Sequence, residues 1–205
     1  MPDMTTPPRT LFLGVTGASG APYAVRLTEK LAELGCRLSL CISESGLTVV
    51  RHELGIPADG REAVTAAFLQ MAHADAVVYH PADMAAAVSS GSAFPDAAVV
   101  CPCSLSTAAE IALGTSSTLI HRVGAVALKE RRPLVLVPRE MPLSVVHLRR
   151  LLEASEAGAA ILPPMPAFYN RPRSLQDAID FVVGKVLSVL GFAHDLYPPW
   201  GSELS

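Results

Sequence analysis

The sequence predicts an α/β fold: a single domain built on a three-layer, doubly wound parallel sheet with helices on both faces. Three observations lead to this prediction. Apolar runs of strand length alternate with helical patterns along the chain. The runs are almost continuously apolar, as expected of parallel strands that are buried on both faces. The 205 residues contain no internal repeat and no low-complexity linker, and this length suffices for one substantial core.

Six apolar runs are the expected strands, and they are LFLGV (11–15), RLSLCI (37–42), DAVVYH (75–80), AAVVCP (97–102), LVLV (134–137) and AAIL (159–162). The stretches between and after them have helical patterns, namely residues 20–35, a segment that ends at Glu53, residues 61–73, a segment that begins near Ser104, and residues 118–131, 143–157 and 174–190. Gly158 stands where a helix C-cap is expected. We predict tails at residues 1–10 and 193–205, the second close to an active site, and one domain over residues 11–192.

The composition points to an assembly of subunits. Half of the residues are hydrophobic, the mean hydropathy is positive, and only 17% are charged, against about 25% in typical soluble domains. No apolar run approaches the roughly 18 residues of a membrane span. We therefore expect the surplus apolar surface to be buried between subunits. The formal net charge of −3 argues against a nucleic-acid surface.

The sequence lacks the common motifs for secretion, disulfide pairing, metal binding, hydrolysis and nucleoside triphosphate binding. The N-terminal segment MPDMTTPPRT lacks the apolar region of a secretory signal, and the four cysteines form neither a disulfide framework nor a zinc motif. These features predict a reducing cytoplasm, with the cysteines as small apolar fillers. The six histidines show no metal-ligand spacing and are interpreted as surface or capping residues, so no metal is expected. Neither a nucleophile elbow nor a P-loop lysine occurs.

Ligands of a parallel α/β sheet gather at the carboxyl ends of the strands, so the turns after the strands are the first places to search. TGASGA (16–21) joins the first strand to a helix, where glycines let the backbone approach an anion at the helix N-terminus. Because it is not G-x-G-x-x-G, it favours a mononucleotide over a dinucleotide. A tight turn that binds no ligand is the alternative.

A second turn repeats this arrangement. PCSLSTA (102–108) places Ser104, Ser106 and Thr107 at the start of a helix, where they could also serve as plain N-caps. Two hydroxyl-rich helix starts at one sheet edge favour a phosphate and a polar ring as ligands. Flavin mononucleotide (FMN) offers both.

A third turn, PRE (138–140), follows the fifth expected strand. Arginine suits a phosphate or a polarised ring oxygen, and Arg139 and Glu140 would emerge into the ligand cleft if that strand is central. A surface ion pair is the alternative.

Four longer segments together resemble the UbiX-type flavin prenyltransferases, and they are TGASGAPYAVRL, CPCSLSTAAEIALG, ALKERRPLVLVPREMPLSVVHL and GAAILPPMPAFYNRP. The resemblance runs from about Leu11 to Gly201. It implies a Rossmann-like or flavodoxin-like fold, a homododecamer and a metal-independent transferase. That enzyme would join a dimethylallyl group from dimethylallyl monophosphate to N5 and C6 of reduced FMN. The product, prenylated FMN, would be the cofactor of a UbiD-type decarboxylase.

The resemblance also implies roles for single residues. FMN would contact Gly17, Ala18, Ser19, Ser43, Ser104, Leu105, Ser106, Thr107 and Arg139. The prenyl phosphate would contact Ser90, Arg122, Lys129, Tyr169 and Lys185, and Trp200 would lay its ring against the allylic cation. Glu53 and Glu140 would be a proton-handling pair, with Ser19 between flavin and substrate, so the implied catalytic residues are Ser19, Glu53, Lys129 and Glu140.

Strand geometry adds a hypothesis about Lys129. This residue precedes the strand that Arg139 follows, so the two lie roughly 17 Å or more apart at about 3.3 Å per residue. One subunit could not easily aim both cations at one phosphate. We hypothesise that Lys129 serves the site of a neighbouring subunit.

The chain also departs from the family pattern. Glu44 stands where these enzymes often carry lysine, and SSTL (116–119) replaces a stretch that commonly contains asparagine. A carboxylate near a phosphate would weaken its binding. Two alternatives to the transferase therefore stay open: an FMN-dependent decarboxylase acting on a cysteine-type substrate, and a flavin-binding carrier without catalysis.

Overall fold

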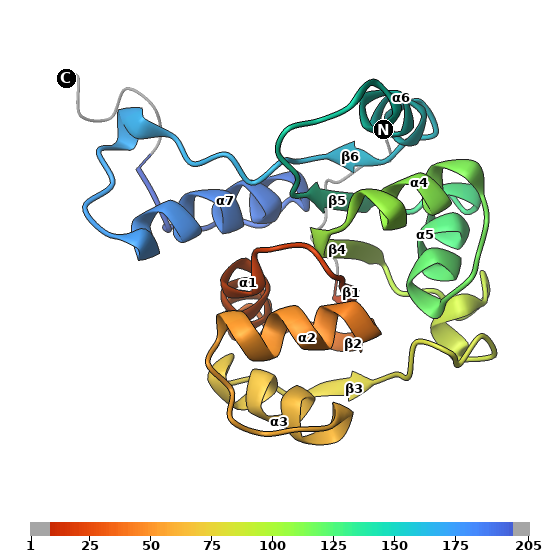
Figure 1. Ribbon diagram of the computed structural model, residues 1–205, viewed down its shortest axis with the longest axis horizontal. Helices are drawn as coiled ribbons and strands as arrows, with labels where there is room; N and C mark the ends of the chain where they lie inside the picture. The colour runs from red at the N-terminus through yellow and green to blue at the C-terminus, as the bar shows by residue number, and fades with distance from the viewer. Residues whose placement is uncertain (1–8, 199–205) are drawn as a thin grey trace.

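Figure 1 shows the computed structural model of the chain, which describes residues 9–198. Six parallel strands form one sheet in the order β3-β2-β1-β4-β5-β6. The strands are β1 (Thr10–Val15), β2 (Arg37–Ile42), β3 (Ala76–Val78), β4 (Ala97–Cys103), β5 (Leu134–Pro138) and β6 (Ala160–Ile161). The direction of winding reverses between β1 and β4, and a ligand crevice opens at such a point in α/β sheets.

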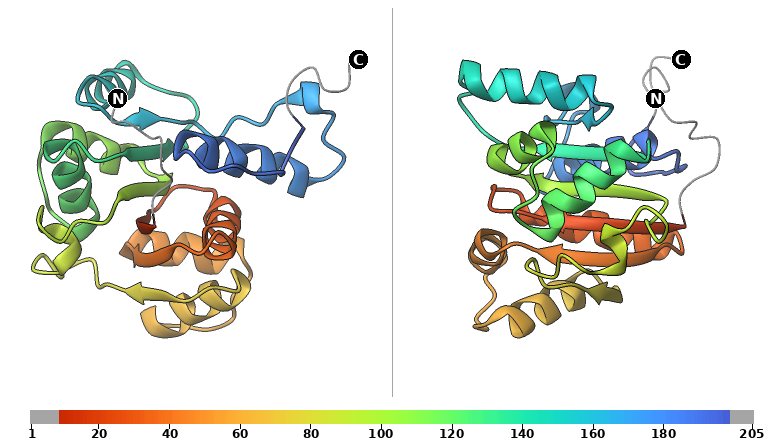
Figure 2. Two further views of the ribbon diagram at one scale, coloured as in Figure 1. Left: turned by 180° about the vertical axis from the view of Figure 1, so that it is seen from behind. Right: turned by 90° about the vertical axis from the view of Figure 1, so that its right-hand side faces the viewer.

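Helices cover both faces of the sheet, which confirms the three-layer, doubly wound prediction (Figure 2). One face carries α1 (Ala21–Glu33), α2 (Glu44–Glu53), α3 (Arg61–Met71) and α7 (Leu175–Val189). The other carries α4 (Leu105–Leu113), α5 (Leu119–Lys129) and α6 (Val145–Glu156). Two short 3-10 turns, η1 (Ala87–Ser89) and η2 (Phe168–Asn170), lie in the connections.

The sheet separates two apolar cores because successive side chains of a strand point to opposite faces. In β1, Leu11 and Leu13 pack on the α1 and α7 side, whereas Phe12 between them packs on the α4 and α5 side. The cysteines are free thiols, and burial raises the pKa of Cys41 and Cys101 to about 12. Their interpretation as small apolar fillers is therefore confirmed for these two buried positions.

The outer strands are shorter than the sequence suggested. β3 has three residues instead of the expected six, and Val77 and Val78 are exposed because no strand pairs beyond this edge. β6 keeps two residues of the run 159–162. The expectation that β5 is central was wrong, because it lies one position in from the β6 edge. Its carboxyl end still neighbours that of β4, since Pro138 pairs with Cys103.

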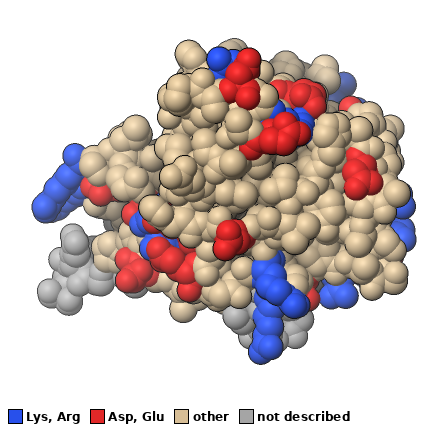
Figure 3. All heavy atoms as spheres, turned by 90° about the horizontal axis from the view of Figure 1, so that it is seen from below, with Lys and Arg blue, Asp and Glu red and all other residues tan. Residues whose placement is uncertain are grey.

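Much of the surface carries no charge. Figure 3 shows one face on which acidic and basic side chains are scattered over a broad uncharged area. On α6, Val145, Val146, Leu148 and Leu152 are all exposed, and Val146 keeps 63% of its surface accessible. These four apolar side chains form the kind of surface that subunits bury on association. Within residues 9–198, no helix has the length and apolar character needed to cross a membrane.

Candidate functional site

The junction between β1 and β4 is fixed by Thr16, which is only 2% exposed. Its hydroxyl donates to the carbonyl of Pro102 at 2.9 Å and accepts the N–H of Ser104 at 2.7 Å. The turn after β1 and the start of α4 are thereby held together at the reversal point of the sheet. Sequence reasoning missed this residue, although it opens the TGASGA motif, because its partners lie more than 80 residues away.

Two positions in this turn require glycine for different structural reasons. A Cβ on Gly17 would lie 2.4 Å from the hydroxyl oxygen of Ser45, so the turn presses against the start of α2. Gly20 has a φ of 132°, which a residue with a side chain rarely adopts, and it directs the chain into α1. Gly17 is therefore required by packing against α2, whatever ligand the turn meets.

Beside this junction lies a cavity of about 450 Å³, within the range of roughly 300–1,000 Å³ typical of small-molecule sites. Most of the residues around it have polar side chains, many of them hydroxyls, and we call it the hydroxyl cleft; it is lined by Thr16, Ser43, Glu44, Ser45, His80, Pro81, Ala82, Ser104, Ser106, Thr107, Ser117, Thr118, Ile120 and His121. The cleft brings together Ser43, after β2, and Ser104, after β4, as the sequence predicted.

Both serines are also helix N-caps. The oxygen of Ser43 accepts the N–H of Gly46 at 3.0 Å at the start of α2, and that of Ser104 accepts the N–H of Thr107 at 3.2 Å at the start of α4. Two helix N-termini thus border one cleft. Their unpaired N–H groups and positive dipole ends suit an anionic group such as a phosphate.

The negative charge of Glu44 on the cleft wall has a partner. Arg61, on α3, forms an ion pair with Glu44 and donates to the carbonyl of Ile42 at 2.7 Å. The Arg61 side chain is only 14% exposed, so its charge is screened less by water than the charge of an arginine in a typical surface ion pair. The concern that Glu44 would repel a phosphate is therefore reduced, because Arg61 supplies a compensating charge.

Glu53 occupies a different place at the same edge. It lines a second cavity, of about 490 Å³, together with Ser19, Tyr23 and the exposed Leu175 of α7. Its carboxylate accepts the N–H groups of Gly20 and Ala21 at 2.9 and 2.8 Å, and so caps α1. Glu53 is thus a carboxylate that is fixed in position by a helix N-terminus.

This setting determines the acidity of Glu53. Burial alone would raise its pKa, but hydrogen bonds from the Ser19 hydroxyl and from the two backbone N–H groups, together with the nearby charge of Arg139, lower the pKa of Glu53 overall. The group is therefore ionised around neutral pH. It can accept a proton there, although it is a weaker base than an ordinary glutamate.

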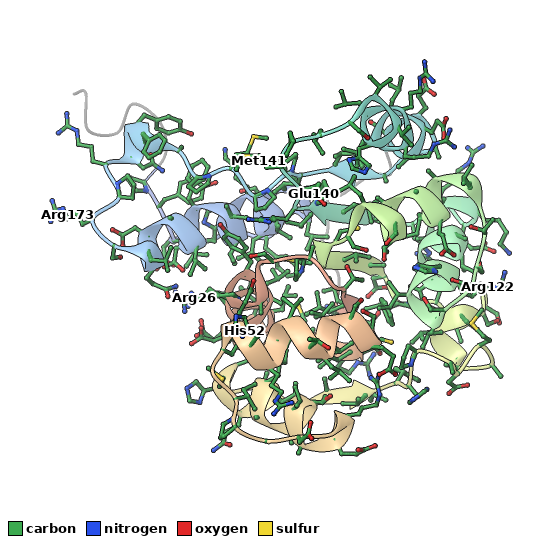
Figure 4. All side chains as sticks on the ribbon, in the orientation of Figure 1. Arg26, His52, Arg122, Glu140, Met141 and Arg173 are labelled. Carbon is green, nitrogen blue, oxygen red and sulfur yellow. The ribbon has the colours of Figure 1, made fainter. Side chains whose placement is uncertain are left out.

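Arg139 and Glu140 follow β5 at the carboxyl edge, as predicted. The N–H of Arg139 donates to the carbonyl of Cys103 at 3.2 Å, which places the residue directly beside the start of α4. Glu140 is exposed, and its carboxylate accepts the N–H of Met141 at 3.0 Å; Figure 4 labels Glu140 and Met141 near the end of β5. Glu53, at the end of α2, and Glu140, in the turn after β5, belong to separate elements of this edge, and their role as a proton-handling pair stays a prediction.

Ser90 and Lys129 lie away from this edge, whereas Arg122 directly follows His121, which lines the hydroxyl cleft, on α5. Lys129, at the end of α5, is 64% exposed and pairs with Glu130 at 2.7 Å. Glu130 in turn lies against Gly91, so the loop that holds Ser90 and the end of α5 meet next to the amino ends of β4 and β5. Arg122 lies on the outer side of α5, far across the view from Glu140 (Figure 4).

Tyr169 and Lys185 lie in a third place, where α7 and η2 extend away from the sheet (Figure 1). The ring of Tyr169 meets Phe181 edge-on at 5.9 Å, and Lys185 Nζ lies 5.4 Å from the centre of the Phe181 ring. The two side chains therefore share one aromatic cluster. Trp200, which the sequence analysis added to this set, lies outside the described residues.

The histidines did not all behave as expected. His147 is a capping residue of α6, in agreement with the prediction. His121 is not: it is 8% exposed, lines the hydroxyl cleft and contacts Glu110, Ser117 and Thr107. The signal available in the sequence was its place in the first turn of an expected helix, four residues after the hydroxyl of Ser117, which precedes that helix. Across residues 9–198, no three or more His, Cys, Asp or Glu side chains are grouped so as to hold a metal ion.

Comparisons with known proteins agree with this geometry. A family model described as Flavoprotein matches residues 2–187. A curated protein of Pseudomonas aeruginosa named flavin prenyltransferase UbiX is 41% identical over 200 residues, which cover 96% of each chain.

Two solved structures are also similar. A crystal structure of AnUbiX (PadA1) in complex with FMN and dimethylallyl pyrophosphate has a TM-score of 0.84 and 38% identity, covering 95% of this chain and 98% of that one. A dodecameric FMN-dependent UbiX-like decarboxylase from Escherichia coli O157:H7 has a TM-score of 0.83 and 42% identity, covering 94% of this chain and all of that one. The chain therefore belongs to the Flavoprotein family and, within it, to the UbiX-type flavin prenyltransferases.

Proposed function

We propose that the protein is a flavin prenyltransferase, which joins the dimethylallyl group of a dimethylallyl phosphate to N5 and C6 of reduced FMN. The observation that carries the proposal is the hydroxyl cleft, at the sheet reversal, in a chain that is similar to such enzymes over nearly its full length. When bound, FMN would supply the nucleophilic nitrogen and carbon atoms of its ring system. The product, prenylated FMN, would serve a UbiD-type decarboxylase.

The residues around the cleft fit FMN as a ligand. Two helix N-termini offer N–H donors for a phosphate, and the hydroxyl oxygens of Ser43, Ser104 and Ser106 offer hydrogen-bonding groups for a polyol chain. Arg139 would contact the ring system, and we assign the remaining flavin contacts to Gly17, Ala18, Ser19, Leu105 and Thr107.

The prenyl donor requires a different set of groups. Departure of its phosphate leaves a delocalised allylic cation and a leaving group of increased negative charge, which fixed cations stabilise. We assign this task to Lys129 and Lys185, with Ser90, Arg122 and Tyr169 as further contacts. Glu53 or Glu140 would accept the proton that the reaction releases, with Ser19 close by. Trp200 and the C-terminal tail would help to exclude water, which would otherwise capture the cation.

We further propose that each active site is shared between subunits of a homododecamer. Lys129 and Ser90 lie by the amino ends of the strands, whereas Arg139 and Ser104 lie at the carboxyl ends. The exposed apolar face of α6 provides surface for such an assembly.

A mixing experiment tests shared sites. Oligomers assembled from Lys129→Ala and Arg139→Ala chains should recover part of the activity that each variant lacks alone, because some sites then receive both intact residues. The absence of rescue in mixed oligomers verified by mass would contradict this arrangement.

Product mass tests the function itself. The protein should convert reduced FMN and dimethylallyl monophosphate into a flavin heavier by one C5 prenyl unit, and dimethylallyl pyrophosphate in a parallel reaction shows which donor it uses. The description of the E. coli structure as a decarboxylase makes that reaction the second candidate. Loss of carbon dioxide from a cysteine-type substrate with the flavin unchanged would favour the decarboxylase, and tight FMN binding with neither reaction would favour a carrier.

We also propose a cytoplasmic location. Its support is chemical: all four cysteines are free thiols, as expected in a reducing compartment.

A further inference from the structure

We propose that His121 is a positioning residue of the hydroxyl cleft, which sets, through Thr107, the direction in which the hydroxyl groups of Ser104 and Ser106 donate. The inference deepens the proposed function and rests on it, because FMN is the expected occupant of the cleft.

The contacts form a chain from the partly exposed carboxylate of Glu110 to the cleft surface. His121 Nδ1 lies 2.9 Å from Glu110 Oε2, and the Ser117 hydroxyl donates to the same oxygen at 2.7 Å. On the other side of the ring, His121 Nε2 lies 3.4 Å from Thr107 Oγ1, the longest link. Thr107 Oγ1 is 3.0 Å from Ser104 Oγ, which is 3.0 Å from Ser106 Oγ.

The carboxylate gives this chain a direction. Ionised Glu110 can only accept, so the proton of a neutral His121 resides on Nδ1, and Nε2 becomes an acceptor. The Thr107 hydroxyl then donates to Nε2 and accepts from Ser104, and Ser104 accepts from Ser106. Ser106, which is exposed, is left with oxygen lone pairs that face the cleft.

Protonation of His121 reverses this order. Both ring nitrogens then donate, so Thr107 must turn its hydroxyl toward Ser104, Ser104 toward Ser106, and Ser106 presents its O–H to the cleft. The backbone N–H groups at the start of α4 already supply donors there. A neutral His121 therefore adds an acceptor, and this combination suits the hydroxyl groups of a ribityl chain.

Burial of the His121 side chain favours the neutral ring. Burial lowers the pKa of His121 by more than the neighbouring Glu110 raises it. The other titratable groups on the cleft are His80, in the loop after β3, and Glu44 of α2, whose charge is paired with Arg61. Arg122, the next residue on α5, is exposed on the outer side of the helix (Figure 4).

Two substitutions of His121 distinguish the roles of its two ring nitrogens. In His121→Asn the side-chain amide reaches the position of Nδ1 only, whereas in His121→Gln it reaches that of Nε2 and can still accept from Thr107. Dissociation constants for riboflavin and FMN, measured by flavin fluorescence between pH 5 and 8, are the readout. Riboflavin is included because the phosphate of FMN titrates near pH 6 by itself.

At pH 8, His121→Asn should weaken riboflavin binding roughly three- to tenfold, as expected for one lost oriented hydrogen bond, and His121→Gln less than about twofold. In acid, the wild-type protein should lose affinity for riboflavin as His121 becomes protonated, whereas His121→Gln should show a flat profile. His73→Asn is the matched control, because His73 is exposed in a turn whose φ of 47° asparagine tolerates, and its profile should match that of the wild type.

A second readout concerns the ring itself. Nitrogen-15 shifts of His121 at pH 8 should show a protonated Nδ1 and an unprotonated Nε2. A protonated Nε2, equal affinities in both His121 variants, or parallel pH profiles in the wild type and His121→Gln would each overturn the inference while leaving the proposed function intact. A folded wild-type protein that binds neither flavin would overturn both.

Discussion

Glu53 shows how one side chain can serve both the fold and the site. Its carboxylate caps α1 through Gly20 and Ala21 and also faces the cavity beside Ser19. Because the hydrogen bonds favour the ionised form, the pKa of Glu53 is lower in the folded chain than in the unfolded one. The stabilisation is therefore present above the unfolded pKa of about 4.3 and is lost as pH falls through the folded pKa.

We predict that Glu53→Gln lowers the free energy of unfolding by about 1–2 kcal/mol at pH 7, since charge-assisted hydrogen bonds become neutral ones. The deficit should shrink as the pH falls from the unfolded pKa of about 4.3 through the lower folded pKa of Glu53, because the carboxylate of the folded wild-type protein becomes protonated over that range. Urea unfolding at pH 7 and at the lowest pH where both proteins fold measures it. Glu140→Gln is the control, because Glu140 caps no helix; a deficit that stays constant with pH would contradict the prediction.

The ion pair between Arg61 and Glu44 leads to a prediction about the affinity for FMN. Arg61→Ala should weaken FMN binding about five- to tenfold, because the carboxylate of Glu44 then repels the phosphate without compensation. Adding Glu44→Gln to that variant should restore most of the affinity, as coupled neighbours do in double-mutant cycles.

Two controls accompany the measurement, which can use flavin fluorescence. Riboflavin, which lacks the phosphate, should respond less than FMN. Arg51→Ala breaks the exposed pair of Arg51 with Asp59 and should leave the FMN affinity unchanged. Failure of the second substitution to rescue binding would mean that Arg61 acts through something other than the Glu44 charge.

At the scale of elements, one ion-pair cluster joins two helices that are distant in sequence. Arg26 on α1 donates to both carboxylate oxygens of Asp180 on α7, at 2.7 and 3.2 Å, and to Glu29 at 2.7 Å. The side chains are largely shielded, and the hydrogen bond to Asp180 is the main reason that the pKa of Arg26 is raised. The cluster anchors the helix that carries Lys185.

Arg26→Ala should lower the free energy of unfolding by about 1–3 kcal/mol, because it leaves a partly buried carboxylate without its fork of donors. Amide exchange in α7 should quicken more than in the strands, since the contact is local to that helix. Arg150→Ala removes a pair within α6 and should cost at most about 0.5 kcal/mol. Equal effects of the two substitutions in thermal or urea unfolding would show that the α1–α7 cluster has no special role.

At the scale of the whole molecule, the exposed apolar side chains of the outer helix α6 matter most. Four apolar side chains on it are exposed although the helix itself packs against α4. A monomer rarely keeps such a surface in water, since burial of apolar area stabilises by about 25 cal/mol per Å². This surface is available for the proposed homo-oligomer.

Val146→Glu should therefore dissociate the assembly into smaller species while the circular dichroism of the chain stays unchanged. The introduced charge would have to be buried without a partner at each interface. Light scattering coupled to size-exclusion chromatography measures the mass. Leu34→Glu, at an isolated exposed position after α1, is the control and should leave the mass as it is. An unchanged mass for Val146→Glu would remove α6 from the interface.

Much of the fold, and the edge of the sheet at which the candidate site lies, could be predicted from the sequence. Continuous apolar runs and their alternation with helices gave the layers and nearly all element bounds, because local periodicity reflects which faces are buried. The turns of β1, β2, β4 and β5 were correctly expected at one edge, since carboxyl ends of parallel strands must meet there. Edge strands were overestimated, because β3 and β6 lack a second neighbour to extend their pairing.

The sequence by itself determined the fold class, the edge at which the turns after β1, β2, β4 and β5 meet, and the hydroxyl-rich start of α4, because each depends on short-range pattern and on the polarity of parallel strands. Only the tertiary structure decided that Thr16 ties β1 to β4, that Arg61 neutralises Glu44, that Glu53 caps α1 and that His121 reaches Thr107. Each of these contacts joins residues 14 to 86 positions apart. Such contacts depend on how helices pack across the sheet, and local periodicity carries no information about that packing.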